Sequence, residues 1–137
     1  MKIFISYRFT GENLDTISDY LDCIKDILEK KGHSVFSSFW EEDTFKKNNF
    51  TRKQLLDYVF QEIDKADACF VFVRSSRKSE GLLLEVGYAL AKNKPLALII
   101  KEDVETVFLK DIAKSVIKYN NLSDLKTKLN KIDLNIG

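Results

Sequence analysis

Short apolar runs of strand character alternate along this chain with longer segments in which apolar residues recur every three or four positions. The apolar runs are residues 2–6, 34–38, 68–73, 96–100 and 116–119. The helical stripes fall after them, at residues 14–28, 55–63, 82–90 and 122–132. The run at 68–73 is continuous and β-prone, which is typical of a central parallel strand covered on both faces. This alternation predicts a parallel sheet joined by right-handed helical crossovers.

Two segments lack a clear period. Residues 39–49 are aromatic and charged without periodicity, which predicts a loop. Residues 103–113 are ambiguous, and we expect them to be helical. The helix ends are better marked, because Gly32 follows two lysines at the end of the first stripe and Asn121 and Asp124 form a capping pattern before the last.

Five strands with helices on both faces predict an α/β fold, a single-domain three-layer sandwich over residues 1–137. The expected strand order is the flavodoxin-like 2-1-3-4-5. Ligands of such sheets bind outside the carboxyl ends of the strands, near the point where the strand order reverses. The segments that emerge there are residues 6–11, 39–42 and 74–81, and we expect the functional site to draw on these three.

Composition excludes several classes of protein. The 137 residues carry 22 Lys plus Arg against 21 Asp plus Glu, a net charge of +1, so a basic binder of nucleic-acid polymers is not expected. No apolar run approaches the ~20 residues that span a bilayer, so we expect no membrane partner and a cytoplasmic protein. Cys23 and Cys69 are expected to be buried free thiols. No cluster of side chains has metal-ligand spacing, so we expect neither a metal nor another cofactor.

Glu85 is the strongest candidate for chemistry. It stands one turn into the predicted helix 82–90, among Leu, Val and Ala. Burial raises the pKa of a carboxyl, whereas the helix dipole favours its charged form by only ~0.3–1 kcal/mol. An ionised carboxylate on the floor of a water-poor cleft is a competent nucleophile or base. A glutamate on the exposed helix face, solvated or paired with Lys92, is the alternative that the pattern leaves open.

Two glycines flank this glutamate. Gly81 stands just before the predicted helix, where it would allow a ligand to approach the backbone closely. Gly87 lies inside the helix, where glycine costs ~1 kcal/mol relative to alanine. A glycine at such a place usually has a packing or functional reason, here room for a group to lie against the helix beside Glu85.

These residues carry a resemblance to a known family. The motif that carries it, together with the Lys94-Pro95 pair and the apolar strand that follow, consists of Ser79, Gly81, Glu85, Val86, Gly87, Tyr88 and Ala89. It resembles the signature of the nucleoside deoxyribosyltransferase superfamily, over roughly the first 100 residues. The superfamily contains transferases that exchange bases on deoxyribonucleosides and hydrolases that cleave the N-glycosidic bond of nucleoside monophosphates.

The resemblance implies roles for two residues. Glu85 matches the nucleophile that attacks the anomeric carbon and forms a glycosyl-enzyme intermediate. The position six residues earlier contacts the 5′ end of the sugar, and it is typically aspartate in the transferases and serine in the monophosphate hydrolases. This chain has Ser79 there. Because a carboxylate would repel phosphate, we expect a 5′-phosphorylated substrate held by Ser79, the amides around Gly81 and the helix N-terminus. A plain helix cap is the alternative for Ser79.

One departure from the family stands at Val59. Members often carry an aspartate at this position that orients or protonates the substrate. Asp57 and Asp64 are nearby in sequence, but helical spacing points them in other directions. The step that protonates the leaving base is therefore the least defined part of the expected mechanism.

The loops after the first two strands supply the remaining candidates. Ser6, Tyr7, Arg8 and Gly11 follow the first strand. Arg8 would pair with a phosphate through two parallel hydrogen bonds and Tyr7 would stack on a base, unless they are a solvated arginine and a packed tyrosine. After the second strand, Phe39 and Trp40 would cover the base or pack the rim.

We therefore expect an enzyme that acts on the N-glycosidic bond of a nucleoside or, in preference, a nucleoside 5′-monophosphate, and that forms a homodimer or higher oligomer, as its resemblance implies. Two alternatives remain open. Residues 3–7 also resemble the first strand of Toll/interleukin-receptor-like domains, some of which cleave NAD, and a non-catalytic nucleotide sensor would explain Val59. Neither the base, nor the 2′-hydroxyl requirement, nor the acceptor is defined by the sequence.

Overall fold

The computed structural model describes residues 1–8 and 11–132, and within these ranges it contains one five-stranded parallel sheet. The strand order is β2-β1-β3-β4-β5, as predicted. The strands are β1 (Lys2–Tyr7), β2 (Ser34–Phe36), β3 (Ala68–Val73), β4 (Leu96–Lys101) and β5 (Ser115–Tyr119). The register pairs Ser6 with Val71 and Val71 with Leu98, so the carboxyl ends of the three central strands meet at one edge.

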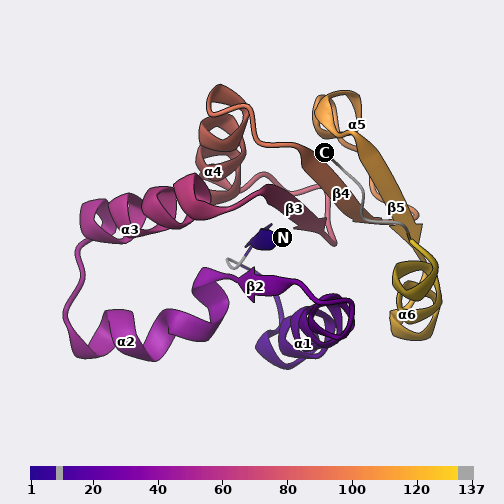
Figure 1. Ribbon diagram of the computed structural model, residues 1–137, viewed down its shortest axis with the longest axis horizontal. Helices are drawn as coiled ribbons and strands as arrows, with labels where there is room; N and C mark the ends of the chain where they lie inside the picture. Colours follow the sequence, from indigo (N-terminus) through magenta and orange to yellow (C-terminus); the bar gives the residue numbers. More distant parts are fainter. Residues whose placement is uncertain (9–10, 133–137) are drawn as a thin grey trace.

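Helices cover both faces of this sheet (Figure 1). Helices α1 (Leu14–Lys30) and α6 (Leu122–Lys131) lie on one face, and α3 (Arg52–Lys65) and α4 (Glu80–Ala91) lie on the other. The predicted three-layer arrangement is confirmed. Within the described ranges, no helix is long and apolar enough to cross a membrane.

The prediction of a loop at residues 39–49 is wrong. A 3₁₀ turn, η1 (Ser38–Glu41), leads directly into α2 (Glu42–Lys47). Its aromatic residues have no helical period because they pack on another element: Phe45 contacts the Phe50 and Tyr58 rings at centroid distances of 5.2 and 5.3 Å. Tertiary aromatic contacts therefore stabilise a helix that local pattern does not reveal.

The expectation of a helix over residues 103–113 is only partly met. Helix α5 covers Leu109–Ile112 alone. Val104 is buried, whereas Val107 and Phe108 are about three-quarters exposed, so this stretch has no continuous apolar stripe. A smaller correction concerns Gly81, which lies in the first turn of α4, one residue after its start at Glu80, and not before the helix.

Two apolar clusters hold the layers together. One joins α1 and α6 to the sheet through alternate strand residues such as Ile3, Ile5 and Phe70. The other joins α3 and α4 to the opposite face through Phe4, Val71 and others. Alternation along β1 therefore directs Ser6, like Phe4, toward α3 and α4. Ser6 is fully buried, and it is one of only two buried polar residues in the described part of the chain, the other being Ser37.

Val59 lies in the second cluster and is 2% exposed. The family's aspartate therefore has no polar environment to occupy here. We predict that Val59→Asp destabilises the protein by about 3 kcal/mol or more at pH 7, because an unpaired carboxylate would be buried. Gln61→Asp, on the exposed face of the same helix, is the matched control and should change the free energy of unfolding by less than ~0.5 kcal/mol. Urea denaturation measures both, and equal stability of the two variants would contradict the burial of position 59.

Candidate active site

The Glu85 carboxylate is held by the end of strand β1. Its Oε1 accepts a hydrogen bond of 2.5 Å from the Ser6 hydroxyl, between residues 79 positions apart in the chain. Ser6 is directed toward α4 by the strand alternation, and Glu85 stands in the second turn of α4, on the flank of the helix that faces β1. The solvated or Lys92-paired alternative does not describe this glutamate, since Lys92 pairs with Asp64 at 3.7 Å.

Burial controls the charge of Glu85. Loss of solvent raises the pKa of its carboxyl from 4.5 to about 7, and the Ser6 hydrogen bond opposes part of that rise. The helix dipole acts most strongly on groups in the first turn, and Glu85 lies in the second turn of α4, so the dipole lowers its pKa little. Near pH 7 about half of the molecules therefore carry the ionised carboxylate that a nucleophile needs.

Tyr7 is placed differently from the role expected for it. Its ring is 8% exposed and meets the Phe39 ring edge-on at 5.6 Å, so it packs the end of the sheet. Burial, then the charges of Glu42 and Glu85, raise the pKa of the Tyr7 hydroxyl, and a contact with Ser38 opposes this. What Tyr7 offers to the site is thus a neutral hydroxyl beside two carboxylates.

Arg8 is held at the carboxyl edge of the sheet, just after β1. Its Nη1 donates a 2.7 Å hydrogen bond to the Ser75 hydroxyl and lies 3.6 Å from the Glu12 carboxylate. Gly11 follows with a φ of +79°, a conformation that side chains other than glycine rarely adopt. Phe9 and Thr10 of this loop lie outside the described residues.

Ser79 is the N-cap of α4. Its hydroxyl oxygen accepts a 3.3 Å hydrogen bond from the backbone N–H of Leu82. This is the capping geometry, and it leaves the hydroxyl proton free to be donated to a ligand. A Cβ added at Gly81 would meet nothing within 4 Å, so the space above the first turn of α4 is open.

A cavity of about 440 Å³ lies at the carboxyl edge between α4 and the β4–α5 connection. Arg8 and Ser79 line it, as does Gly87 on the flank of α4 that faces away from Glu85. Glu85 itself is not among the lining residues. The structure therefore brings together the expected anion-binding residues, and it places the nucleophile candidate across α4 from this cavity.

Trp40 is not brought to Glu85 by any contact in the structure. Its indole N–H donates to the Asp22 carboxylate at 3.0 Å, and Lys25 lies 4.6 Å from its ring centroid. Both partners belong to α1. Trp40 thus anchors the β2–α2 connection to that helix, and its role over a base stays a prediction.

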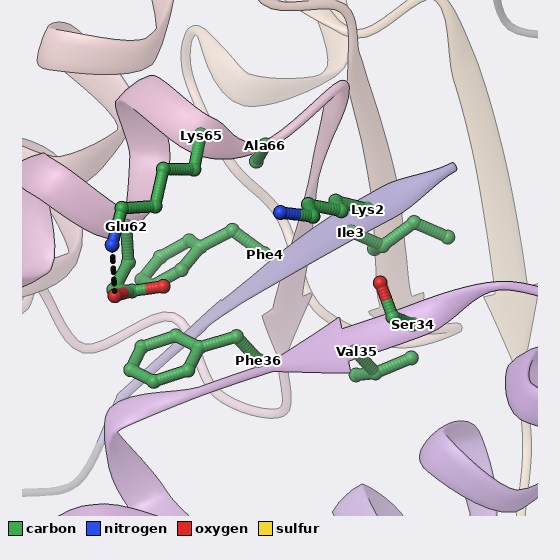
Figure 2. Close-up of a pocket in the computed structure, with 9 residues that line it drawn as sticks. All are labelled: Lys2, Ile3, Phe4, Ser34, Val35, Phe36, Glu62, Lys65 and Ala66. Carbon is green, nitrogen blue, oxygen red and sulfur yellow. Dashed lines mark hydrogen bonds and ion pairs between the residues drawn. The ribbon is translucent and has the colours of Figure 1, made fainter.

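A second, smaller cavity lies at the other edge of the sheet (Figure 2). It measures about 180 Å³ and lies where β1 and β2 begin, beside the last turn of α3. Figure 2 shows the Phe4 and Phe36 side chains along one part of it and the Glu62–Lys65 ion pair, 3.3 Å, beside them. Parallel sheets bind their ligands at the opposite edge, so this cavity is not the candidate active site.

Sequence reasoning missed three residues of the carboxyl edge. Ser75 and Glu12 hold Arg8, and Arg77 lies within 3.2 Å of the Cβ position of Gly11. Ser75 and Arg77 fall in the segment 74–81 that was expected to line the site, but nothing in their spacing singles them out. Glu12 is four residues after Arg8, a spacing that indicates a pair only within a helix, and α1 begins later, at Leu14.

Comparison with known proteins decides the family. A model of the nucleoside 2-deoxyribosyltransferase family matches residues 9–129. The chain belongs to this family. The match extends beyond the first 100 residues in which the resemblance was seen, and it includes β4, β5 and most of α6. A search of curated protein sequences gave no match.

Solved structures show the same fold. The CMP N-glycosidase BcmB of Clostridium botulinum superposes with a TM-score of 0.70 at 19% identity, covering 96% of this chain and all of that one. A 2-deoxyribosyltransferase of Bacillus psychrosaccharolyticus superposes with a TM-score of 0.66 at 21% identity, covering 98% and 93%. The protein is thus an enzyme of the nucleoside 2-deoxyribosyltransferase family, acting by cleavage or transfer at an N-glycosidic bond.

The raised pKa of Glu85 has a consequence for stability. The folded protein holds the Glu85 proton more tightly than the unfolded chain does. The contribution of this carboxyl to stability is therefore greatest below about pH 4.5 and is lost as pH rises through about 7. Glu85→Gln removes this loss. We predict that the variant becomes more stable than wild type by about 2 kcal/mol at pH 8, with little difference at pH 4.

Urea denaturation at pH 4, 6 and 8 measures this difference. Glu102→Gln, at an exposed carboxylate after β4, is the matched control and should show no comparable rise. If the difference in the free energy of unfolding between Glu85→Gln and wild type does not change with pH, the raised pKa of Glu85 is contradicted.

Proposed function

We propose that this enzyme cleaves the N-glycosidic bond of a nucleoside 5′-monophosphate, with Glu85 as the nucleophile. The observation that carries the proposal is the partly buried Glu85 carboxylate, which is hydrogen-bonded to Ser6 at the carboxyl edge of the sheet and has a raised pKa. The membership of the family supports the reaction class. The preference for a phosphorylated substrate rests on the residues that surround the neighbouring cavity.

The reaction is a double displacement. The ionised Glu85 oxygen attacks the anomeric carbon, the N-glycosidic bond breaks with its electron pair passing to the base nitrogen, and a glycosyl ester forms. Water, or a second base, then attacks the same carbon and releases the carboxylate, as in retaining glycosidases. The Ser6 hydrogen bond orients the carboxylate and stabilises its charged form, before attack and again on release.

The phosphate would lie against Arg8 and Ser79. Arg8 is anchored by Ser75, so its planar guanidinium is already oriented for a two-pronged pair with phosphate oxygens. Ser79 has a hydroxyl proton to donate, and the first N–H groups of α4 add their partial positive charge. An aspartate at position 79 would instead suit a substrate with an uncharged 5′-hydroxyl.

Departure of the base proceeds without the family's aspartate, since Val59 is buried in the core. We assign the protonation of the base to no side chain, because burial and the charges of Glu42 and Glu85 raise the pKa of Tyr7 and make its hydroxyl a weaker proton donor. In this proposal a base that leaves readily when protonated by solvent would be the preferred leaving group.

A substrate panel tests the proposal. We predict that purified protein releases free base from at least one nucleoside 5′-monophosphate faster than from the matching nucleoside, with free base measured by chromatography. Glu85→Ala should reduce the rate at least 10³-fold, since it removes the covalent step, and Glu85→Gln should do the same with the shape preserved. Unchanged turnover in these variants would refute the nucleophile assignment.

The panel also includes NAD. Nicotinamide release without base release from any nucleotide monophosphate would favour the activity seen in some Toll/interleukin-receptor-like domains. Binding of nucleotides without any base release would favour a sensor. Either result overturns the proposed function.

We also propose that the enzyme is a cytoplasmic homodimer or higher oligomer. Large apolar side chains are exposed on α4 and on the adjoining β4–α5 connection, namely Leu83, Leu84, Leu90, Val107 and Phe108. Three of them, Leu83, Val107 and Phe108, are about 50–75% exposed and also line the 440 Å³ cavity. An apolar surface beside a site favours a second copy that covers it.

We predict that Phe108→Glu shifts the protein from an oligomer toward the monomer without loss of folding, because the residue is 72% exposed and contributes little to the core. Leu14→Glu, at an exposed leucine at the start of α1, is the matched control and should leave the mass unchanged. Size-exclusion chromatography with light scattering measures both. A wild-type monomer at high micromolar concentration would contradict the proposal.

A further inference from the structure

Two arginines from different loops converge on Gly11. A Cβ placed on Gly11 would lie 3.0 Å from Arg8 Nη2 and 3.2 Å from Arg77 Nη1. Arg8 follows β1, and Arg77 belongs to the connection between β3 and α4. Since β1 and β3 are neighbours in the sheet, their following loops bring the two guanidinium groups to one backbone position.

Positive charges so arranged repel one another unless something negative lies between or beside them. Arg8 has the Glu12 carboxylate at 3.6 Å, and its Nε is buried without a hydrogen-bond partner. Arg77 is exposed, and within residues 1–8 and 11–132 it forms no ion pair. The pair therefore has one nearby carboxylate for two guanidinium charges, and it retains donors for a further anion.

Both arginines line the 440 Å³ cavity, together with Lys78 and Ser79. One carboxylate, Glu105, also lines it, but Lys110 lies 3.5 Å from that side chain. The cavity therefore has a cationic mouth at the β1 and β3 loops and apolar walls further along α4. Two planar guanidinium groups facing one point suit a phosphate, which presents three oxygens to separate donors.

We propose that Arg77 and Arg8 close on the 5′-phosphate of the substrate from two sides, and that Arg77 is the residue that makes this enzyme prefer a phosphorylated nucleotide to a nucleoside. Gly11 leaves the gap between them open, since a Cβ there would lie 3.0 and 3.2 Å from the two guanidinium groups, closer than ordinary van der Waals contact. This inference rests on the proposed function and adds a specificity-determining residue to it.

The test compares kcat/KM for the best 5′-monophosphate of the panel with kcat/KM for its nucleoside. For Arg77→Ala the ratio of these two values should fall at least tenfold, through a higher KM for the monophosphate, while turnover of the nucleoside stays as in wild type. The ratio for Arg77→Lys should lie between those of wild type and Arg77→Ala, because lysine keeps the charge and loses the two-pronged geometry. Arg52→Ala, at an exposed arginine at the start of α3, is the matched control and should leave the ratio unchanged.

A binding measurement separates this inference from the proposed function. In the Glu85→Gln background, calorimetry with ribonucleoside and deoxyribonucleoside 5′-monophosphates and the matching nucleosides measures preference without turnover. If monophosphates bind more tightly than nucleosides and Arg77→Ala abolishes this preference, the role of Arg77 is supported. If Arg77→Ala retains the preference, the role of Arg77 is overturned and the proposed function stands. If the Glu85→Gln protein with Arg77 intact shows no preference, both the monophosphate substrate and the role of Arg77 are overturned.

Discussion

The hydrogen bond between Ser6 and Glu85 is the contact on which the proposed chemistry depends. It joins the end of the central strand β1 to the second turn of α4, and it gives a partly buried carboxylate its hydrogen-bond partner in the described structure. Two opposing effects meet there, because burial makes the acid weaker while the hydroxyl donor makes it stronger. The balance leaves Glu85 close to half ionised at neutral pH, which suits a group that must act as a nucleophile and then leave.

Strand β1 positions Arg8 as well as Ser6, the hydrogen-bond partner of Glu85. Ser6 faces the α3–α4 side near the end of β1, and Arg8, which follows the last strand residue Tyr7, lines the cavity beside the first turn of α4. Helix α4 in turn carries Glu85 on one flank and borders the cationic cavity with the other. A substrate that reaches both would cross the first turn of α4, where Gly81 adds no side chain. In the proposed function, two rigid elements of the fold would thus position the phosphate and the anomeric carbon.

The strand order and the edge that carries the site follow from the sequence, because parallel alternation and crossover handedness leave few arrangements. Glu85 was identifiable as an acid among apolar neighbours. What local pattern does not reveal comes from contacts between distant segments: α2 exists because Phe45 meets Phe50 and Tyr58, and Trp40 turns to Asp22 on α1. Arg77 is missed although the predicted strand order makes β1 and β3 neighbours, because its approach to Arg8 at Gly11 depends on the paths of two loops.

The charges at the two flanks of α4 affect each other. A phosphate dianion brought toward Glu85 would by itself raise the pKa of that carboxyl above its value of about 7 and leave less of it ionised. Guanidinium groups on the phosphate offset this effect, because the nearby charge that Glu85 experiences is then close to zero. A single arginine, already sharing Glu12, neutralises a dianion only in part. Two arginines around Gly11 would therefore both hold the substrate and keep the nucleophile ionised when the substrate is bound.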